Sequence, residues 1–227
     1  MSPDSPSTWP HGRALVRTRV LSRREIAPQV HVLGLERHAE FKPGQVVAVT
    51  RSPDLPPRLY SIASGVSEPA LEILFDRKPG GELTPWLAGL EPGDAVWISA
   101  PFGEFIGEAD PAWWIATGTG IAPFVSMLRS GLAPGKTLLH GARSPAGFLF
   151  QDEFAAALDD RYIRCCSGGT GSGLYNGRLT AWLAGQPALP DNVRFMLCGS
   201  SEMVVAVRER LFEKRVAYDN VSAEIYF

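Results

Sequence analysis

A glycine-rich bend near the middle of the chain constrains the fold more than any other segment. An apolar run at residues 113–116 precedes it and predicts a buried strand. Beyond the bend, apolar residues recur at helical spacing, Pro123 suits a first helical turn, and Gly131 suits a helix end. Residues 117–120 should therefore join a strand to a helix at 121–130, where N–H groups and the helix dipole favour a phosphate. A tight turn without a ligand explains the glycines equally well.

Composition limits what else the chain can be. Its 227 residues suit one large domain or two small ones, and its formal charge of −2 gives no strong attraction to nucleic acid or membrane. Three cysteines, an odd and sparse set, favour a reducing compartment such as the cytoplasm and exclude a four-cysteine metal site within the chain. The Ser- and Pro-rich N-terminus lacks a signal-peptide pattern, so residues 1–12 are expected to form a disordered leader.

Two different patterns of expected secondary structure divide the remaining residues. Residues 13–108 show short alternating strands between turn signals, which predicts an antiparallel β-barrel with one short helix at 83–90. Residues 109–227 alternate strands with helices, which predicts an α/β domain with a doubly wound parallel sheet. Its expected strands are 113–117, 137–141, 162–166, 193–198 and 221–227, and its expected helices are 121–130, 151–158, 178–184 and 201–214.

Two segments of the expected barrel carry polar chemistry. In strand geometry Arg58 and Tyr60 share one face, where a guanidinium and an aromatic ring suit a planar, phosphate-bearing ligand. Gly80 and Gly81 precede the expected short helix, whose first N–H groups are a second candidate anion site. An ordinary edge strand, and a loop in which Thr84 caps the helix, remain equally simple explanations.

Five motifs, taken in order, resemble those of the ferredoxin–NADP reductase superfamily. They are Arg58-x-Tyr60-Ser61, Gly81-x-x-Thr84, Pro92-Gly93-Asp94, Gly118-Thr119-Gly120-Ile121-Ala122-Pro123 and Cys198-Gly199-x-x-x-Met203. The resemblance covers nearly all of residues 13–227. It implies a flavin-binding barrel followed by a nicotinamide-nucleotide domain, which agrees with the two patterns of expected secondary structure.

The resemblance implies that the barrel binds FAD, with FMN left open. Ser61 would hydrogen-bond near flavin N5, Tyr60 would stack on the ring, and Arg58 would bind the pyrophosphate. The other implied flavin residues are Leu59, Gly80, Gly81, Thr84, Tyr226 and Phe227. The C-terminal segment is similar to a family ending in which a glutamate lies two residues before the flavin-stacking tyrosine, as Glu224 does here before Tyr226. Phe227 adds one residue, so either aromatic ring, or a plain core strand, fits the pattern.

The second domain is implied to bind the coenzyme. The implied residues are Thr117, Gly118, Thr119, Gly120, Arg143, Ser167, Tyr175, Arg178, Cys198, Gly199 and Met203. Cys198 would lie beside nicotinamide C4, and a buried structural cysteine is the alternative. Ser61, Cys198 and Glu224 are the implied catalytic residues. Members that choose NADP place an arginine after the serine, where this chain has Gly168, so NADPH is favoured on Arg143 and Arg178 with NADH left open.

The implied activity is hydride exchange between NADPH and the flavin, with one-electron transfer to or from a separate carrier, ferredoxin or flavodoxin, by a monomer. An acid-free run of arginines is a candidate docking patch or a solvated strand face: Arg13, Arg17, Arg19, Arg23 and Arg24. Two alternatives stay open. One is an NAD(P)H-dependent reductase of free flavin, ferric complexes or quinones, and the other is an electron-transfer flavin subunit of a larger complex.

Overall fold

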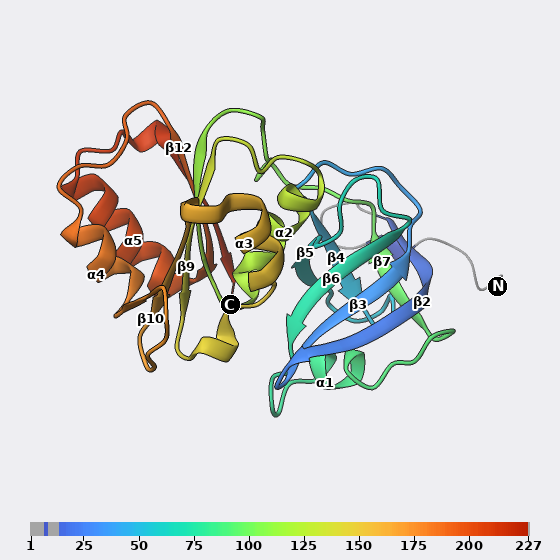
Figure 1. Ribbon diagram of the computed structural model, residues 1–227. Coiled ribbons are helices and arrows are strands. Elements are labelled where there is room, and N and C mark those ends of the chain that lie inside the picture. Colours follow the sequence, from blue (N-terminus) through green and yellow to red (C-terminus); the bar gives the residue numbers. More distant parts are fainter. Residues whose placement is uncertain (1–6, 9–13, 227) are drawn as a thin grey trace, which may run out of the picture. The chain divides into compact units, whose positions relative to one another are not determined.

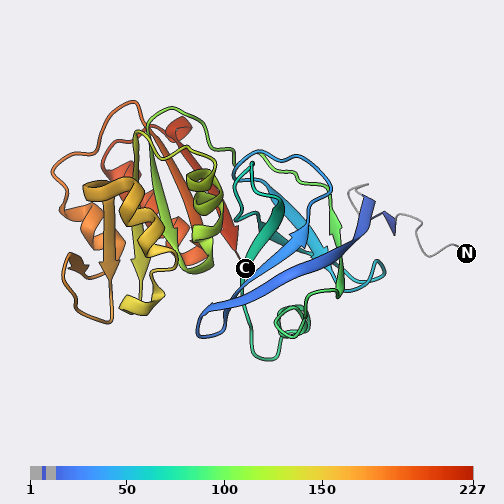
Figure 2. The same ribbon diagram turned by 45° about the vertical axis from the view of Figure 1, so that its right-hand side comes forward.

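The computed structural model describes residues 7–8 and 14–226 (Figures 1 and 2). Arg13, Phe227 and most of the expected leader lie outside these residues, although the leader contains a short strand, β1 (Ser7–Thr8). The chain forms two compact units, Met1–Ile106 and Gly107–Phe227. Each unit is described by itself.

The first unit is an antiparallel barrel. Its strands are β2 (Ala14–Ala27), β3 (Val30–Glu36), β4 (Val46–Thr50), β5 (Arg58–Ser61), β6 (Ala70–Asp76) and β7 (Ala95–Ser99). They are ordered β5-β4-β7-β2-β3-β6, and β1 pairs with β2. A β-bridge between Ile62 and Ile73 joins the two ends of this order, which closes the barrel. The predicted antiparallel barrel is confirmed.

The long strand β2 holds the barrel together because it pairs with two neighbours in turn. Its first half pairs with β7 and its second half with β3, with register shifts after Val20 and after Glu25. Such irregularities bend a strand and let it cross from one side of a barrel to the other. Inside, the strands bury an apolar cluster that includes Leu33, Val47 and Ile73. This core supports the outward-facing residues of β5.

A short helix, α1 (Leu83–Leu87), follows β6. The sequence pattern extended it to residue 90, which was wrong. The N–H groups of Gly89 and Leu90 bond three residues back, to Trp86 and Leu87, so the chain tightens into a turn.

The second unit is a six-stranded parallel sheet in the order β11-β10-β9-β8-β12-β13. The strands are β8 (Ala112–Thr117), β9 (Lys136–Ala142), β10 (Tyr162–Cys166), β11 (Leu174–Asn176), β12 (Arg194–Ser200) and β13 (Val221–Tyr226). The predicted doubly wound sheet is confirmed, and five strands fall where the pattern placed them. The three-residue edge strand β11 was not predicted, because it follows a glycine-rich loop.

Helices cover both faces of this sheet (Figure 1). They are α2 (Ala122–Arg129), α3 (Gln151–Leu158), α4 (Leu179–Gly185) and α5 (Ser201–Glu213). One face buries Ile115 and Leu197 against α4 and α5. On the other, Trp114 stacks on Phe124 of α2 with ring centroids 5.6 Å apart. Helix α2 is buried beyond its predicted apolar stripe, since Ser126 and other residues off that stripe are also inaccessible to solvent.

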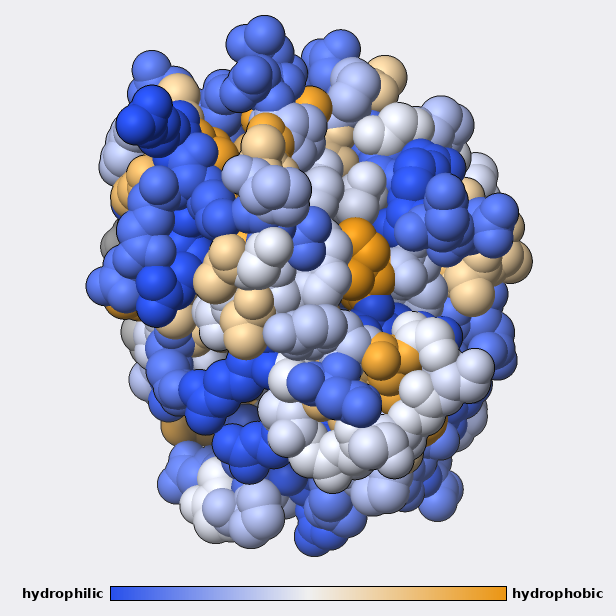
Figure 3. Space-filling model, turned by 60° about the vertical axis from the view of Figure 1, so that its left-hand side comes forward, coloured by the Kyte–Doolittle hydropathy of each residue, from blue (hydrophilic) through white to orange (hydrophobic). Residues whose placement is uncertain are grey.

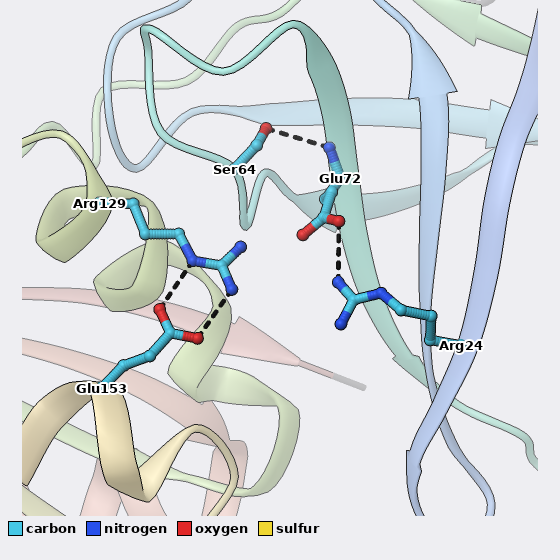
Figure 4. A network of polar contacts seen from close by, with 5 residues as sticks. All are labelled: Arg24, Ser64, Glu72, Arg129 and Glu153. Atoms are coloured by element: carbon cyan, nitrogen blue, oxygen red, sulfur yellow. Dashed lines mark hydrogen bonds and ion pairs between the residues drawn. The ribbon is translucent and has the colours of Figure 1, made fainter.

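Ion pairs reinforce each unit separately (Figure 4). In the barrel, Arg24 of β2 pairs with Glu72 of β6 at 2.8 Å, and the Ser64 hydroxyl accepts a hydrogen bond from the Glu72 N–H at 3.0 Å. In the second unit, Arg129 of α2 donates to both carboxylate oxygens of Glu153 of α3, at 2.9 and 2.8 Å. The latter is a bidentate, charge-assisted pair that fixes two helices beside each other.

The face in Figure 3 is largely hydrophilic, with only scattered hydrophobic residues. Such scattered residues are normal on a protein surface. No helix in the described part of the chain is both long enough and apolar enough to cross a lipid bilayer.

Candidate functional site

The glycine bend joins β8 to α2 as the sequence predicted, with one added turn. A 3₁₀ turn, η1 (Gly118–Ile121), separates the strand from the α-helix, and Gly118 has a φ of 56°. Pro123 lies in the first turn of α2 as expected. Gly131 ends the helix with a φ of 81°, and its N–H bonds the Leu128 carbonyl at 3.0 Å.

The bend lies at the point where the winding of the sheet reverses. From β8 the chain proceeds to β9, β10 and β11 on one side, whereas β12 and β13 lie on the other side. In open α/β sheets, ligands bind at the carboxyl ends of strands at such a switch point. The bend follows β8 directly and Cys198 and Gly199 lie near the end of β12, so these motifs meet there.

The two motifs touch so closely that only glycine fits. A β-carbon on Gly120 would lie 2.3 Å from the Cys198 carbonyl oxygen. A β-carbon on Gly199 would lie 2.6 Å from both the Thr117 Oγ1 and the Met203 methyl carbon. Thr117, Gly120, Cys198, Gly199 and Met203, all predicted from the sequence, therefore form one cluster.

Cys198 is fully buried and lies beside Glu224 on the neighbouring strand β13. Burial raises the pKa of the Cys198 thiol well above its ordinary value, the Glu224 carboxylate raises it further, and a side-chain hydrogen bond with Tyr226 opposes the rise. The thiol therefore stays protonated at neutral pH. It is a neutral, compact side chain rather than a nucleophile.

A buried histidine supports the sheet beside this cluster. His140 of β9 pairs in register with Ala116, which in turn pairs with Cys198. The His140 Nδ1 and the Tyr162 hydroxyl form a hydrogen bond of 3.0 Å, and burial lowers the pKa of His140 to about 3. His140 is therefore neutral at any physiological pH. Sequence reasoning did not single it out.

The residues expected at the ribose end of the coenzyme surround the end of β10. The Ser167 N–H bonds the Ala142 carbonyl at 3.0 Å, which fastens the loop after β10 to the segment carrying Arg143. Tyr175 lies on the unpredicted strand β11 and is 38% exposed. Arg178 precedes α4, and its guanidinium pairs with the Glu202 carboxylate at 3.3 Å. No local sequence pattern indicated this partner.

Four of the residues expected to bind the flavin, 58–61, form β5 of the barrel. Arg58 is exposed, and its guanidinium has no hydrogen bond or ion pair among the described residues. Leu59 is 51% exposed, whereas Ser61 is fully buried. Tyr60 packs edge-on against Phe75 at 6.2 Å, and burial raises the pKa of its hydroxyl to about 12. An unpaired guanidinium beside apolar and aromatic side chains fits a planar, anionic ligand.

The glycine loop of the barrel departs from the expected anion site. Gly80 has a φ of 77° with open space around it, which fits close approach by a ligand. The Gly81 N–H, however, donates to the Lys78 carbonyl at 3.0 Å, so it is not free to bind an anion in this conformation. The Thr84 hydroxyl accepts from the Lys78 N–H at 2.9 Å rather than capping α1.

Three of the four described arginines of β2 have a side-chain partner, whereas Arg17 is exposed and has no ion pair among the described residues. Arg19 pairs with Glu36 at 3.4 Å, Arg23 donates to the Leu90 carbonyl at 2.9 Å, and Arg24 pairs with Glu72. The absence of acids in this segment of sequence therefore overstates its positive charge in the fold, because Glu36 and Glu72 on neighbouring strands pair with two of these arginines.

No group of three or more His, Cys, Asp or Glu residues in the described part of the chain is arranged to hold a metal ion.

A closed antiparallel barrel followed by a parallel sheet with a glycine bend at its switch point defines a flavin- and nicotinamide-dependent class of oxidoreductase. A family model for the oxidoreductase NAD-binding domain matches residues 114–209. Ferredoxin–NADP reductase B of Sorangium cellulosum is 32% identical over 219 residues, covering 84% of this chain and 88% of that protein. The chain therefore belongs to the ferredoxin–NADP reductase family, as its motifs predicted.

Two further comparisons extend this assignment. A glycine betaine monooxygenase reductase subunit of Pseudomonas aeruginosa is 29% identical, covering 93% of this chain and 63% of that protein. A ferredoxin–NADP reductase from Neisseria gonorrhoeae, solved with bound FAD and NADP, superposes with a TM-score of 0.84. Its sequence is 22% identical and the match covers 94% of this chain and 99% of that one, which shows the fold.

Proposed function

We propose that this protein is an FAD-dependent ferredoxin (or flavodoxin)–NADP reductase. It exchanges a hydride with NADPH and passes single electrons to or from a separate carrier protein in the cytoplasm. The observation that carries the proposal is the contact of the glycine bend with Cys198 and Gly199 at the switch point of the sheet. The odd and sparse set of three cysteines supports a reducing compartment.

In this proposal the barrel residues bind FAD. Arg58 neutralises the pyrophosphate, Tyr60 stacks on the ring, Leu59 lies beside it on the same strand, Gly80 allows close approach, and Ser61 provides a hydrogen bond at N5. The Tyr60 hydroxyl stays protonated because its pKa is raised to about 12. Bound FAD supplies the redox chemistry, namely hydride acceptance and single-electron release.

The second unit binds and orients the nicotinamide nucleotide. The bend at 117–120 receives the pyrophosphate, while Arg143, Ser167, Tyr175 and Arg178 contact the adenosine end. Cys198 is buried behind the proposed nicotinamide-binding surface, so its neutral thiol supports that surface without adding charge and forms no covalent bond with the substrate. Glu224 and Tyr226, on the neighbouring strand β13, form part of the same proposed nicotinamide-binding surface.

A second candidate is a reductase component that serves an oxygenase. It is favoured by the match to the monooxygenase reductase subunit. That subunit is a longer protein, and the match covers 63% of it. Reduction of cytochrome c by NADPH, with and without an added carrier protein, tests the first proposal. Strong stimulation by added ferredoxin or flavodoxin supports the first proposal. Full activity without a carrier would favour a direct reductase of small acceptors instead.

A further inference from the structure

The structure explains why the arginine that NADP-dependent members place after the serine is missing here. A β-carbon on Gly168 would lie 2.7 Å from the Arg143 carbonyl oxygen. That oxygen belongs to the backbone, and the adjoining segment is fixed by the Ser167 N–H bond to Ala142. No side chain fits at residue 168 unless this backbone moves. Among the residues expected at the ribose end of the coenzyme, positive charge is then left to Arg143 and Arg178.

These two arginines differ in their surroundings. The Arg143 side chain is exposed and has no ion pair within the described part of the chain. Arg178 already has an anionic neighbour, since its Nη1 lies 3.3 Å from the Glu202 Oε1. Glu202 stands in the first turn of α5, shortly after Cys198 and Gly199 at the end of β12. A carboxylate thus lies at the same edge of the sheet as the coenzyme-binding residues.

A carboxylate at this place has opposite effects on the two coenzymes. It repels the 2′-phosphate of NADPH and also competes with it for the Arg178 guanidinium. It accepts hydrogen bonds from the ribose hydroxyls of NADH, the role that an acidic residue plays in NAD-binding folds. The Arg178–Glu202 pair is weak, because its side chains are 75% and 82% exposed, so a phosphate dianion can displace the carboxylate.

We propose that Glu202 determines coenzyme selectivity: its carboxylate lowers the affinity of this protein for NADPH relative to its affinity for NADH. The inference rests on the proposed binding of a nicotinamide nucleotide at the carboxyl edge of the second sheet. Removing one negative charge within several ångströms of a 2′-phosphate, in a solvent-screened site, should tighten NADPH binding about three- to tenfold.

The test is the affinity of the purified, flavin-loaded protein for NADP⁺ and NAD⁺, measured by titration calorimetry at low ionic strength. Glu202→Gln should bind NADP⁺ about three- to tenfold more tightly than wild type, with NAD⁺ binding unchanged or weakened. The gain should shrink at high salt. Arg178→Ala should weaken NADP⁺ binding and leave NAD⁺ nearly unaffected. Titration with 2′,5′-ADP and 5′-AMP repeats the comparison without the nicotinamide.

Glu209→Gln is the matched control. Glu209 is an exposed glutamate on the same helix with no ion pair among the described residues, so the substitution changes net charge equally and should leave both affinities unchanged. If Glu202→Gln leaves the ratio of the two affinities within twofold of wild type while Arg178→Ala lowers it, the Glu202 proposal is overturned and the coenzyme site stands. If wild type binds neither nucleotide, the proposed function fails and this inference fails with it.

Discussion

Cys198 on β12 and Glu224 on β13 are register partners in a parallel pair of strands, so a buried thiol lies beside a carboxylate. Both burial and the negative charge hold the pKa of the thiol well above its ordinary value. A cysteine kept neutral in this way is suited to shaping a binding surface and unsuited to nucleophilic attack.

This relationship predicts how stability falls at alkaline pH. The unfolded chain loses the thiol proton near the ordinary pKa of about 8.5, whereas the folded protein retains it. The contribution is complete below that pH and is lost as the pH rises toward the folded pKa. The free energy of unfolding in urea should therefore fall as the pH rises above the ordinary thiol pKa. Cys198→Ala should decline less steeply than wild type above pH 8, and equal slopes would contradict the argument.

His140 makes the opposite prediction in acid. Its pKa is lowered to about 3 in the folded protein, whereas the unfolded chain gains a proton near about 6.5. The contribution of His140 is therefore present above the unfolded pKa and is lost as the pH falls toward the folded one. Wild type should lose about 2 kcal/mol from this group between pH 7 and pH 5. His140→Gln, which retains a polar partner for Tyr162, should lose correspondingly less. An unchanged pH slope would rule out the buried, neutral histidine.

The close contact at the switch point predicts different outcomes for two glycines of the same bend. Gly120→Ala places a β-carbon 2.3 Å from the Cys198 carbonyl oxygen, which only backbone movement can relieve. We expect a cost of about 1–3 kcal/mol and at least tenfold weaker NADP⁺ binding. Gly118→Ala meets no atom within 4 Å and should cost about 1 kcal/mol for its positive φ. Urea unfolding and calorimetry measure both, and wild-type coenzyme affinity in Gly120→Ala would show that this contact does not shape the site.

The Arg129–Glu153 pair should contribute more than an ordinary surface ion pair. It is bidentate, the Arg129 side chain is 17% exposed, and the guanidinium lies 5.3 Å from the centre of the Phe150 ring. A double-mutant cycle with Arg129→Met and Glu153→Gln should give a coupling of about 1 kcal/mol, discounted because Glu153 is partly exposed.

The exposed pair Arg210–Glu213 on α5 is the comparison for this cycle. The same substitutions there should give a coupling of about 0.5 kcal/mol or less. Equal couplings for the two pairs would mean that bidentate geometry and partial burial add nothing measurable between α2 and α3.

Local signals in the sequence were sufficient for much of this fold. The strand before the bend, Pro123 in the first turn of α2 and Gly131 at its end all depend on neighbours within a few residues. The bend itself was predicted, but the reason that Gly120 must be glycine was not. That reason is the approach of the Cys198 backbone, a residue far away in the sequence.

Other features depend on contacts that no local pattern contains. The Arg178–Glu202 pair, the partners of the β2 arginines and the His140–Tyr162 bond all join segments from different strands or helices. Strand β11 has too few residues to give a periodic signal. The roles proposed for the individual flavin and coenzyme residues remain predictions from motif and geometry.

The central claim is that this chain binds a flavin that a nicotinamide coenzyme reduces. Its most direct test is anaerobic stopped-flow mixing of the purified protein with NADPH and with NADH, followed by the visible absorbance of the flavin. The account predicts a yellow protein whose flavin absorbance is bleached, more effectively by NADPH, and returns on addition of oxidised ferredoxin or flavodoxin. A colourless protein that takes up no FAD, or a bound flavin that neither coenzyme reduces, would contradict it.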